Sequence, residues 1–120
     1  MEKPHKRLIA WQKSMDLVVL IYELTRGFPK EETYGLIAQM RRAVVSGPSN
    51  IAEGAADRSK DQFRNFLRIA IGSLNELNTQ LEISFRIGYL QAEEHDRAQN
   101  LLDECLAVTY GLKRSLEQPL

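Results

Sequence analysis

Few residues in this sequence have side chains that perform acid–base or metal chemistry: its 120 residues include two histidines and one cysteine. Di-iron sites in four-helix proteins need Glu-x-x-His pairs on inward-facing helices. The one such pattern, at residues 2–5, contains a proline and lies before the first expected helix. His95 stands beside Glu93 and Glu94, where we expect a solvated helix start. We therefore expect no metal site and no other cofactor.

Residues suited to nucleophilic catalysis lack the partners that they would need. A catalytic cysteine requires a nearby base and a lowered pKa, whereas Cys105 lies on an apolar helical stripe with Leu102 and Val108, as a core residue does. The sequence contains no glycine-rich phosphate loop and no Gly-x-Ser-x-Gly motif. The carboxylate pairs at 31–32 and 93–94 fall at helix starts, where the helix dipole accounts for them. We do not expect an enzyme.

Cysteine usage and hydropathy indicate the compartment. A single cysteine cannot form an intramolecular disulfide, which favours a reducing environment. The longest apolar run, residues 17–22, is far shorter than the ~20 residues that a membrane helix needs. The first residues lack the apolar core of a signal peptide. We expect a cytoplasmic protein that does not associate with membranes.

Apolar residues recur at helical spacing in four segments, which we place at 8–25, 31–53, 59–88 and 93–116. The connections between them are short, and short connections make consecutive helices antiparallel neighbours. The prediction is an all-α fold, an antiparallel up-down-up-down four-helix bundle. It forms one domain over residues 1–120, with residues 1–7 as a flexible basic tail.

Local signals refine the helix ends. Ser59 and Gln62 have the spacing of a capping box, in which Ser59 accepts from the Gln62 backbone and the Gln62 side chain reaches back. Pro48 falls inside the second helix and predicts a kink or a break. Gly54 is the expected C-cap of that helix.

The first helix has more apolar surface than one bundle core requires, since residues 11, 15, 18 and 22 form one stripe and residues 17, 20, 21 and 24 another. In the second helix, small and polar residues at 39–54 allow another helix to approach closely, within or between subunits; a helix end with a break is the alternative. Arg41 and Arg42 are expected to pair with carboxylates. The residues expected at helix–helix or subunit contacts are Trp11, Met15, Ser46, Ser49, Asn50 and Glu53.

The charge is balanced overall, with 16 Lys and Arg against 16 Asp and Glu, but it is unevenly distributed. Residues 1–30 carry six basic and three acidic side chains, and residues 91–120 carry three and six. These regions could meet within the chain or between subunits, and a solvated face is the alternative to nucleic-acid binding. Arg64 and Arg68 share one helical face. The candidate nucleic-acid-binding residues are Lys3, Lys6, Arg7, Lys13, Arg58, Lys60, Arg64 and Arg68.

A series of short motifs resembles a known family. The motifs are Phe28-Pro29, the segments 32–36 (Glu-Thr-Tyr-Gly-Leu) and 39–43 (Gln-Met-Arg-Arg-Ala), Ser46, and the segments 50–54 (Asn-Ile-Ala-Glu-Gly) and 70–77 (Ala-Ile-Gly-Ser-Leu-Asn-Glu-Leu). In this order they resemble the family of the 23S rRNA intervening-sequence protein and, more distantly, the accessory protein of diversity-generating retroelements. The sequence departs from the usual pattern at Gly47, where a branched apolar residue is common.

The resemblance implies an antiparallel four-helix bundle that assembles into a ring-like homopentamer. The retroelement relatives present a basic surface to nucleic acid and to a reverse transcriptase. Two functions follow as expectations. The first is a non-enzymatic accessory protein associated with RNA or DNA. The second is a structural or protein-interaction scaffold that does not bind nucleic acid and whose protein partner is unknown.

Overall fold

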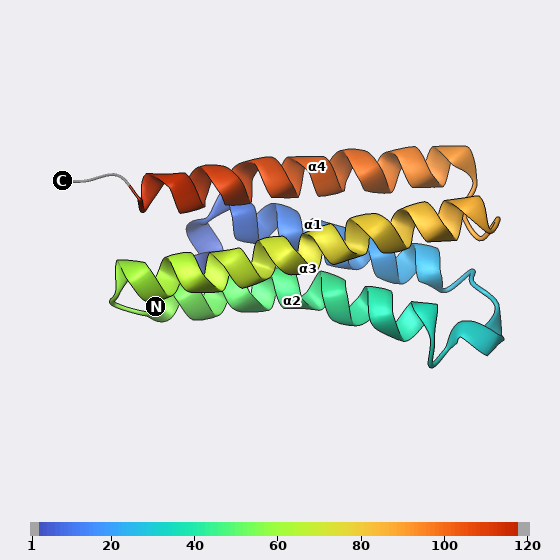
Figure 1. Ribbon diagram of the computed structural model, residues 1–120, viewed down its shortest axis with the longest axis horizontal. Helices are drawn as coiled ribbons and strands as arrows, with labels where there is room; N and C mark the ends of the chain where they lie inside the picture. Colours follow the sequence, from blue (N-terminus) through green and yellow to red (C-terminus); the bar gives the residue numbers. More distant parts are fainter. Residues whose placement is uncertain (1–2, 118–120) are drawn as a thin grey trace.

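The computed structural model describes residues 3–117, and four long helices make up most of them. The elements are η1 (Pro4–Arg7), α1 (Ile9–Thr25), η2 (Lys30–Glu32), α2 (Leu36–Ala56), α3 (Lys60–Arg86) and α4 (Ala92–Ser115). The long helices alternate in direction (Figure 1), and α1 packs against both α2 and α4, so that they close a bundle. No strand occurs among the described residues. The predicted all-α four-helix bundle is confirmed.

Apolar faces of all four helices meet in the centre of the bundle. Leucines at positions 17, 74, 77, 81 and 102 are fully buried there. Cys105 belongs to the same cluster, and burial raises the pKa of its thiol to about 11. Because the thiol stays protonated and out of contact with solvent, the interpretation of Cys105 as a core residue is confirmed.

The second helix begins later than predicted, at Leu36 rather than Glu31. Residues 30–32 form the short 3₁₀ helix η2, and Glu32 then bridges two elements. One carboxylate oxygen of Glu32 accepts a hydrogen bond from the Leu36 backbone N–H at 3.1 Å, and the other accepts one from the Tyr89 hydroxyl at 2.8 Å. The side chain that was expected inside the helix therefore caps it from outside.

Of the kink or break predicted at Pro48, the break does not occur, and the predicted C-cap at Gly54 is wrong. The helix α2 continues through Pro48, which removes only one backbone donor. Gly54 lies buried within α2, and the helix ends two residues later, at Ala56. Phe63 and Phe66 of α3 pack directly on Gly54, since a side chain there would collide with them. The small residues of α2 thus serve a close helix–helix contact, and the alternative of a broken helix end does not apply.

Hydrogen bonds cap the backbone of α3 at both of its ends. Ser59 Oγ accepts a hydrogen bond from the Gln62 N–H at 3.3 Å, as predicted, but no return bond from the Gln62 side chain occurs among the described residues. At the other end, Gly88 has a φ of 87°. The Tyr89 N–H donates to the Ser84 carbonyl at 2.9 Å, which completes a Schellman motif that stops the helix.

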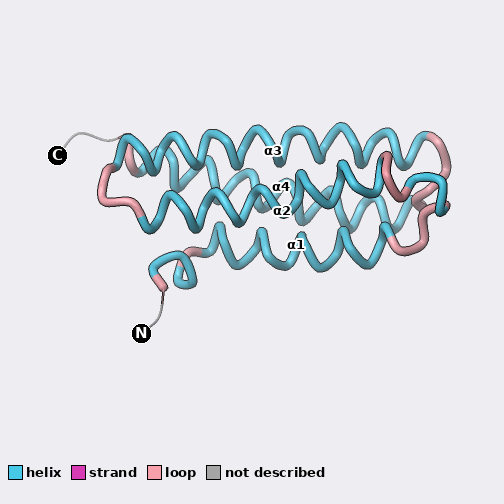
Figure 2. Tube along the Cα trace, turned by 90° about the horizontal axis from the view of Figure 1, so that it is seen from below, coloured by secondary structure: helices cyan, strands magenta, loops and turns pink. Residues whose placement is uncertain are grey.

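The chain start is also more structured than the flexible tail expected over residues 1–7. Residues 4–7 form η1, which packs against α1 and α2 (Figure 2). The His5 ring contacts the Trp11 ring edge-on, with centroids 4.8 Å apart, and Gln12 donates a hydrogen bond to the Lys6 carbonyl at 2.9 Å. Residues 4–7 thus make contacts with the rest of the bundle, while residues 1–2 of the expected tail lie outside the described residues.

Arg41 binds the end of α1 instead of a carboxylate. Its Nε donates to Thr25 Oγ1 at 3.0 Å, and its guanidinium lies 4.4 Å from the centre of the Tyr22 ring. A cation at the C-terminal end of a helix stabilises the helix dipole. The expectation of carboxylate pairing is therefore wrong for Arg41.

We expect Gly54→Ala to destabilise the protein. The added methyl carbon would lie 2.8 Å from Phe63 Cδ1 and 3.0 Å from Phe66 Cβ. Overpacking of this kind lowers the free energy of unfolding by about 1–3 kcal/mol. Gly72→Ala in α3 is the matched control, because no atom beyond its chain neighbours and the nearby backbone of its own helix lies within 4 Å of its methyl position. The control should raise stability by about 0.5–1 kcal/mol. Urea unfolding at one protein concentration measures both, and equal effects would contradict the close contact.

Candidate nucleic-acid interface

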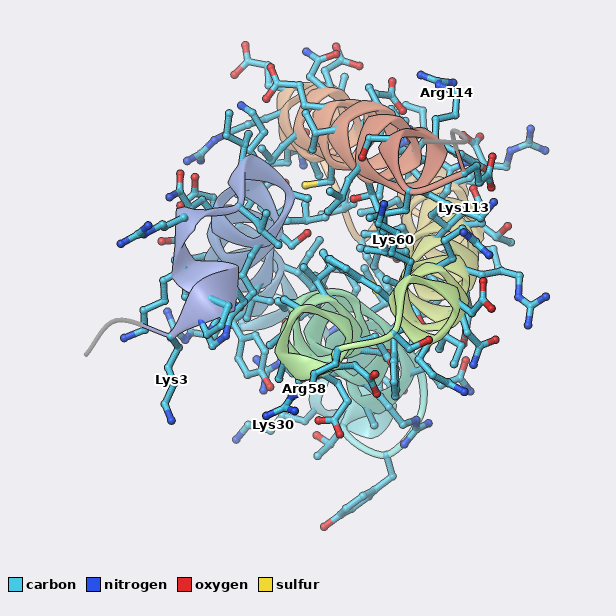
Figure 3. All side chains as sticks on the ribbon, turned by 90° about the vertical axis from the view of Figure 1, so that its left-hand side faces the viewer. Lys3, Lys30, Arg58, Lys60, Lys113 and Arg114 are labelled. Atoms are coloured by element: carbon cyan, nitrogen blue, oxygen red, sulfur yellow. The ribbon has the colours of Figure 1, made fainter. Side chains whose placement is uncertain are left out.

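Most of the predicted basic residues gather at one end of the bundle. Because consecutive helices are antiparallel, η1, the α2–α3 turn and the last turn of α4 all lie there (Figure 1). We define the basic end as residues 3–7, 53–68 and 113–117. Figure 3 looks onto it and shows Lys60 toward the middle, with Lys113 and Arg114 beside α4. Lys3 and Arg58 lie on the side of α1 and α2.

Folding concentrates positive charge at this end although the chain is neutral. The basic end contains nine Lys and Arg against four Asp and Glu, so the rest of the chain contains seven against twelve. Acidic residues at 31–32 and 93–96 lie at the opposite end of the bundle. The helix α3 alone has 27 residues, or ~40 Å at 1.5 Å per residue. This length exceeds the Debye length of ~8 Å at physiological salt several times, so the far carboxylates do not cancel the positive potential.

Five cations of the basic end make neither an ion pair nor a side-chain hydrogen bond with residues 3–117, and all five are exposed. They are Lys3, Lys6, Arg58, Lys60 and Arg114. A surface cation without a protein partner is neutralised only by solution ions, which a polyanion can replace. This group forms the accessible part of the site.

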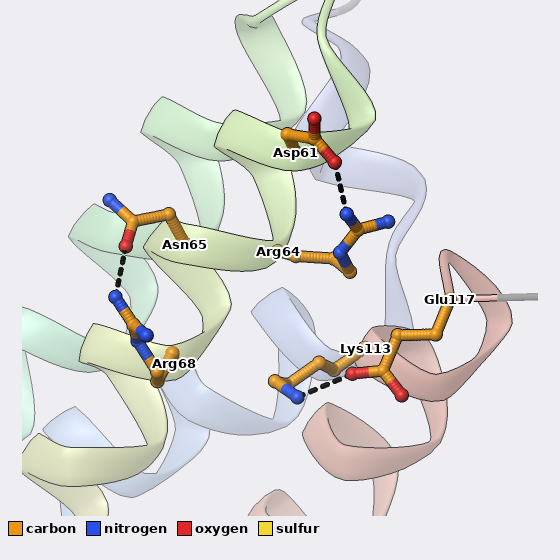
Figure 4. Close-up of a pocket in the computed structure, with 6 residues that line it drawn as sticks. All are labelled: Asp61, Arg64, Asn65, Arg68, Lys113 and Glu117. Atoms are coloured by element: carbon orange, nitrogen blue, oxygen red, sulfur yellow. Dashed lines mark hydrogen bonds and ion pairs between the residues drawn. The ribbon is translucent and has the colours of Figure 1, made fainter.

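A second group of cations surrounds a shallow depression of about 230 Å³ between α3 and α4 (Figure 4). Arg64 donates one hydrogen bond to Asp61 and another, at 2.7 Å, to the Leu116 carbonyl. Arg68 donates to the side-chain oxygen of Asn65 at 2.5 Å. Arg64 and Arg68 therefore share one surface, as their spacing predicted.

The remaining residues of this depression are Lys113 and Glu117, whose side chains are 2.5 Å apart. Lys113 and Arg114 were not among the predicted residues, because they fall in the acidic region 91–120 of the sequence. The topology was the signal that could have found them. In an up-down-up-down bundle the end of the fourth helix lies beside the start of the first and third.

Lys13 is separate from the other predicted cations. Its Nζ lies 3.1 Å from a carboxylate oxygen of Glu104, which connects α1 to α4. The basic front and the acidic end of the sequence thus meet within the chain, one of the two arrangements that the charge distribution allowed. Lys13 has a structural partner, and we leave it out of the candidate interface.

The predicted contact residues divide between the side of α2 that faces α3 and the outer face of α1 and α2. Ser46 accepts a hydrogen bond from Ser73 of α3 at 2.8 Å, and Asn50 donates to the Ser46 carbonyl at 2.8 Å. Ser46 therefore contributes to the α2–α3 contact, whereas Asn50 bonds within α2. Glu53 is exposed near the end of the helix. The other three predicted residues, Trp11, Met15 and Ser49, line a groove along the outer face of α1 and α2.

This α1–α2 groove has a volume of about 340 Å³ and is mostly apolar. Its lining is Trp11, Met15, Val18, Val45, Pro48, Ser49 and Ala52. Met15 and Val45 are each 38% exposed. Beyond Val18 a second depression continues along α1, lined in part by Val19, which is 56% exposed. The excess apolar surface predicted for the first helix is present as a continuous strip.

His95 occupies a packed position instead of the expected solvated helix start. Its side chain is 14% exposed and stacks on Phe85, with ring centroids 4.5 Å apart. Its Nε2 lies 3.7 Å from Glu82. Within residues 3–117 no group of three or more His, Cys, Asp and Glu side chains could hold a metal ion. In the same range, no helix has the length and hydropathy needed to cross a bilayer.

We expect Arg64→Ala to loosen the last turn of α4. The substitution removes the bond from the guanidinium to the Leu116 carbonyl, which ties α4 to α3. Losing a hydrogen bond from a half-exposed charged donor should lower the free energy of local opening by about 1 kcal/mol. This corresponds to roughly five-fold faster exchange of the nearby amide hydrogens. Arg68→Ala is the control, because among residues 3–117 Arg68 bonds only within α3. Hydrogen-exchange mass spectrometry compares the two, and equal exchange near residue 116 would contradict a clamping role.

Comparisons with known proteins agree with this architecture. A solved structure from Bacteroides thetaiotaomicron, described as a protein with unknown function from the S23 ribosomal protein family, is similar with a TM-score of 0.82 and 25% sequence identity. The match covers 88% of this chain and 96% of that one. Among curated proteins, none matches this sequence. The family model described as 23S rRNA-intervening sequence protein matches residues 6–111, which is most of the chain, and confirms the resemblance found in its motifs. The chain belongs to the 23S rRNA-intervening sequence protein family.

Proposed function

We propose that this protein is a cytoplasmic, non-enzymatic accessory protein that binds RNA through its basic end and acts as a ring-like homopentamer. The observation that carries this proposal is the concentration of partner-free cations at one end of a neutral molecule. Neutralising phosphates with Lys and Arg, and releasing their counterions, supplies most of the affinity in nucleic-acid binding that does not depend on sequence.

The chemistry of the basic end favours recognition of the phosphate backbone over recognition of bases. Its partner-free side chains are lysines and arginines, and the Trp and Phe side chains in or next to it, Trp11, Phe63 and Phe66, are half-buried. Base recognition usually needs exposed aromatic side chains for stacking, or amide groups that reach base edges. We therefore propose binding with little sequence preference, which selects RNA by the position of its phosphates.

Self-association is the second part of the proposal, and the α1–α2 groove supports it. Exposed apolar side chains from Met15 to Val19 form a strip whose exposure to water is unfavourable, and such patches mark interaction sites. A second copy of the chain could bury this strip, and the five-fold number follows from the family resemblance. Repeating the basic end around a ring would multiply weak phosphate contacts into useful avidity.

The alternative is a ring-forming scaffold without affinity for nucleic acid. It is favoured by the neutral overall charge and by the four carboxylates within the basic end, two of which bind its cations. Both functions share the self-association surface. They differ in whether binding depends on salt.

We expect Arg58→Ala/Lys60→Ala to weaken RNA binding. On single-stranded RNA, log–log plots of affinity against salt should lose about 0.7 in slope for each phosphate contact removed, or about 1.4 for two. Filter binding across a salt series measures this slope. Lys30→Ala/Arg97→Ala is the matched control, because it removes the same charge at the opposite end of the bundle. If the RNA affinity of the wild-type protein does not change with salt, the RNA-binding proposal is contradicted and the scaffold remains as the function.

We expect the protein to be a homo-oligomer, and Val45→Glu to dissociate it. A charge at this 38% exposed position would be buried without a partner if a second copy covers the α1–α2 groove. Ile83→Glu is the control, since Ile83 is similarly exposed, at 44%, but lies on α3 away from the groove. Size-exclusion chromatography with light scattering gives the masses. A monomeric wild type in dilute solution would contradict the assembly.

A further inference from the structure

The depression between α3 and α4 at the basic end is lined by basic side chains, as an anion-binding site is, but carboxylate side chains also line it. Arg64, Arg68 and Lys113 contribute three positive charges to it. Two carboxylates, Asp61 and Glu117, lie among them (Figure 4). Asp61 is in the first turn of α3, where the helix dipole favours a negative charge.

Glu117 has no such explanation. It lies two residues beyond the end of α4, where the helix dipole disfavours a carboxylate. The bond to Lys113, at 2.5 Å, holds it in place. Together with Lys113, the charges of Arg64 and Arg114 keep the pKa of the Glu117 carboxyl below its ordinary value. Lys113 is therefore the cation in direct contact with this carboxylate, and Arg64 and Arg114 add only the field of their charges.

A carboxylate and a phosphodiester present the same feature to these cations. Each is a monoanion with two oxygen atoms that accept hydrogen bonds from guanidinium and ammonium groups. The contact of Lys113 with Glu117 is thus one that a phosphate group could take over, and Arg64 and Arg68 line the same depression. Arg68 strengthens this view, because its only hydrogen bond is to the neutral Asn65, so its charge is not compensated by an ion pair among the described residues.

We infer that Arg64, Arg68 and Lys113 form a seat for one phosphate group, and that Glu117 occupies this seat as an internal competitor which the ligand must displace. The inference rests on the proposed function for the source of that phosphate, the backbone of RNA. It adds a specific site and a built-in limit on affinity. The partner-free cations attract the polyanion, and displacement of Glu117 then lets one phosphate bind between α3 and α4.

The test compares Glu117→Gln with Glu93→Gln. Both substitutions remove one negative charge, but Glu93 is exposed in the first turn of α4, at the opposite end of the bundle. Inorganic phosphate is titrated into each protein at constant ionic strength, and the Nε–Hε signals of Arg64 and Arg68 are followed by NMR. The same proteins are then titrated with a fluorescent oligouridylate, and binding is read from anisotropy.

We expect Glu117→Gln to bind phosphate about two- to five-fold more tightly than Glu93→Gln, the range for an exposed charge pair. The RNA affinity should rise by a similar factor. Adding Lys113→Gln to Glu117→Gln should remove the gain. Equal phosphate affinity in the two single variants, or no response of the arginine signals in Glu117→Gln, would overturn the seat even if the wild type binds RNA. A phosphate gain without RNA binding by any variant would retain the seat and refute the proposed function.

Discussion

The contact between α2 and α3 at Gly54 is the constraint on which the basic end depends. Phe63 and Phe66 lie directly on the backbone of α2 because Gly54 has no side chain. This fixes the helices against each other immediately before the short turn that joins them. The turn then carries Arg58 at the tip of the bundle and Lys60 at the start of α3. The close contact thus holds the start of α3 against α2 at the end of the bundle that also carries η1 and the last turn of α4.

The basic residues in and near this end divide into structural and exposed charges. Lys13 and Arg64 hold helices together, the first through Glu104 and the second through the Leu116 carbonyl. The Lys13 charge is thus paired within the chain, whereas Arg64 also lines the depression with Arg68 and Lys113. The exposed cations at positions 3, 6, 58, 60 and 114 have no such task. A neutral composition therefore coexists with a strongly polarised surface, and the overall charge says little about whether a polyanion can bind.

Much of this fold could be predicted from the sequence, because helical periodicity alone identifies four amphipathic segments and their order. Features that depend on a neighbouring helix could not. From their residue types alone, Pro48 and Gly54 predict the end of a helix. The structure shows that α2 continues through both, and both are buried in the bundle. Glu32 looks like a first-turn residue, whereas its bond to Tyr89 draws it out of the helix.

The candidate site was predictable in part for a similar reason. Arg64 and Arg68 follow from spacing within one helix, and the structure brings them to the same depression. Lys113 and Arg114 are remote in sequence from the other cations and sit in an acidic region, so a search by local charge overlooks them. Only the antiparallel topology places them beside the start of α3. Conversely, Lys13 belongs to the basic region of the sequence but is withdrawn by a partner on α4.

The central claim is that RNA binds at the basic end. Ultraviolet crosslinking of a bound oligouridylate, followed by mass spectrometry of the crosslinked peptides, tests it most directly. The account predicts crosslinks within residues 3–7, 53–68 and 113–117. Crosslinks concentrated at the opposite end, around residues 30–36 and 86–97, would contradict it.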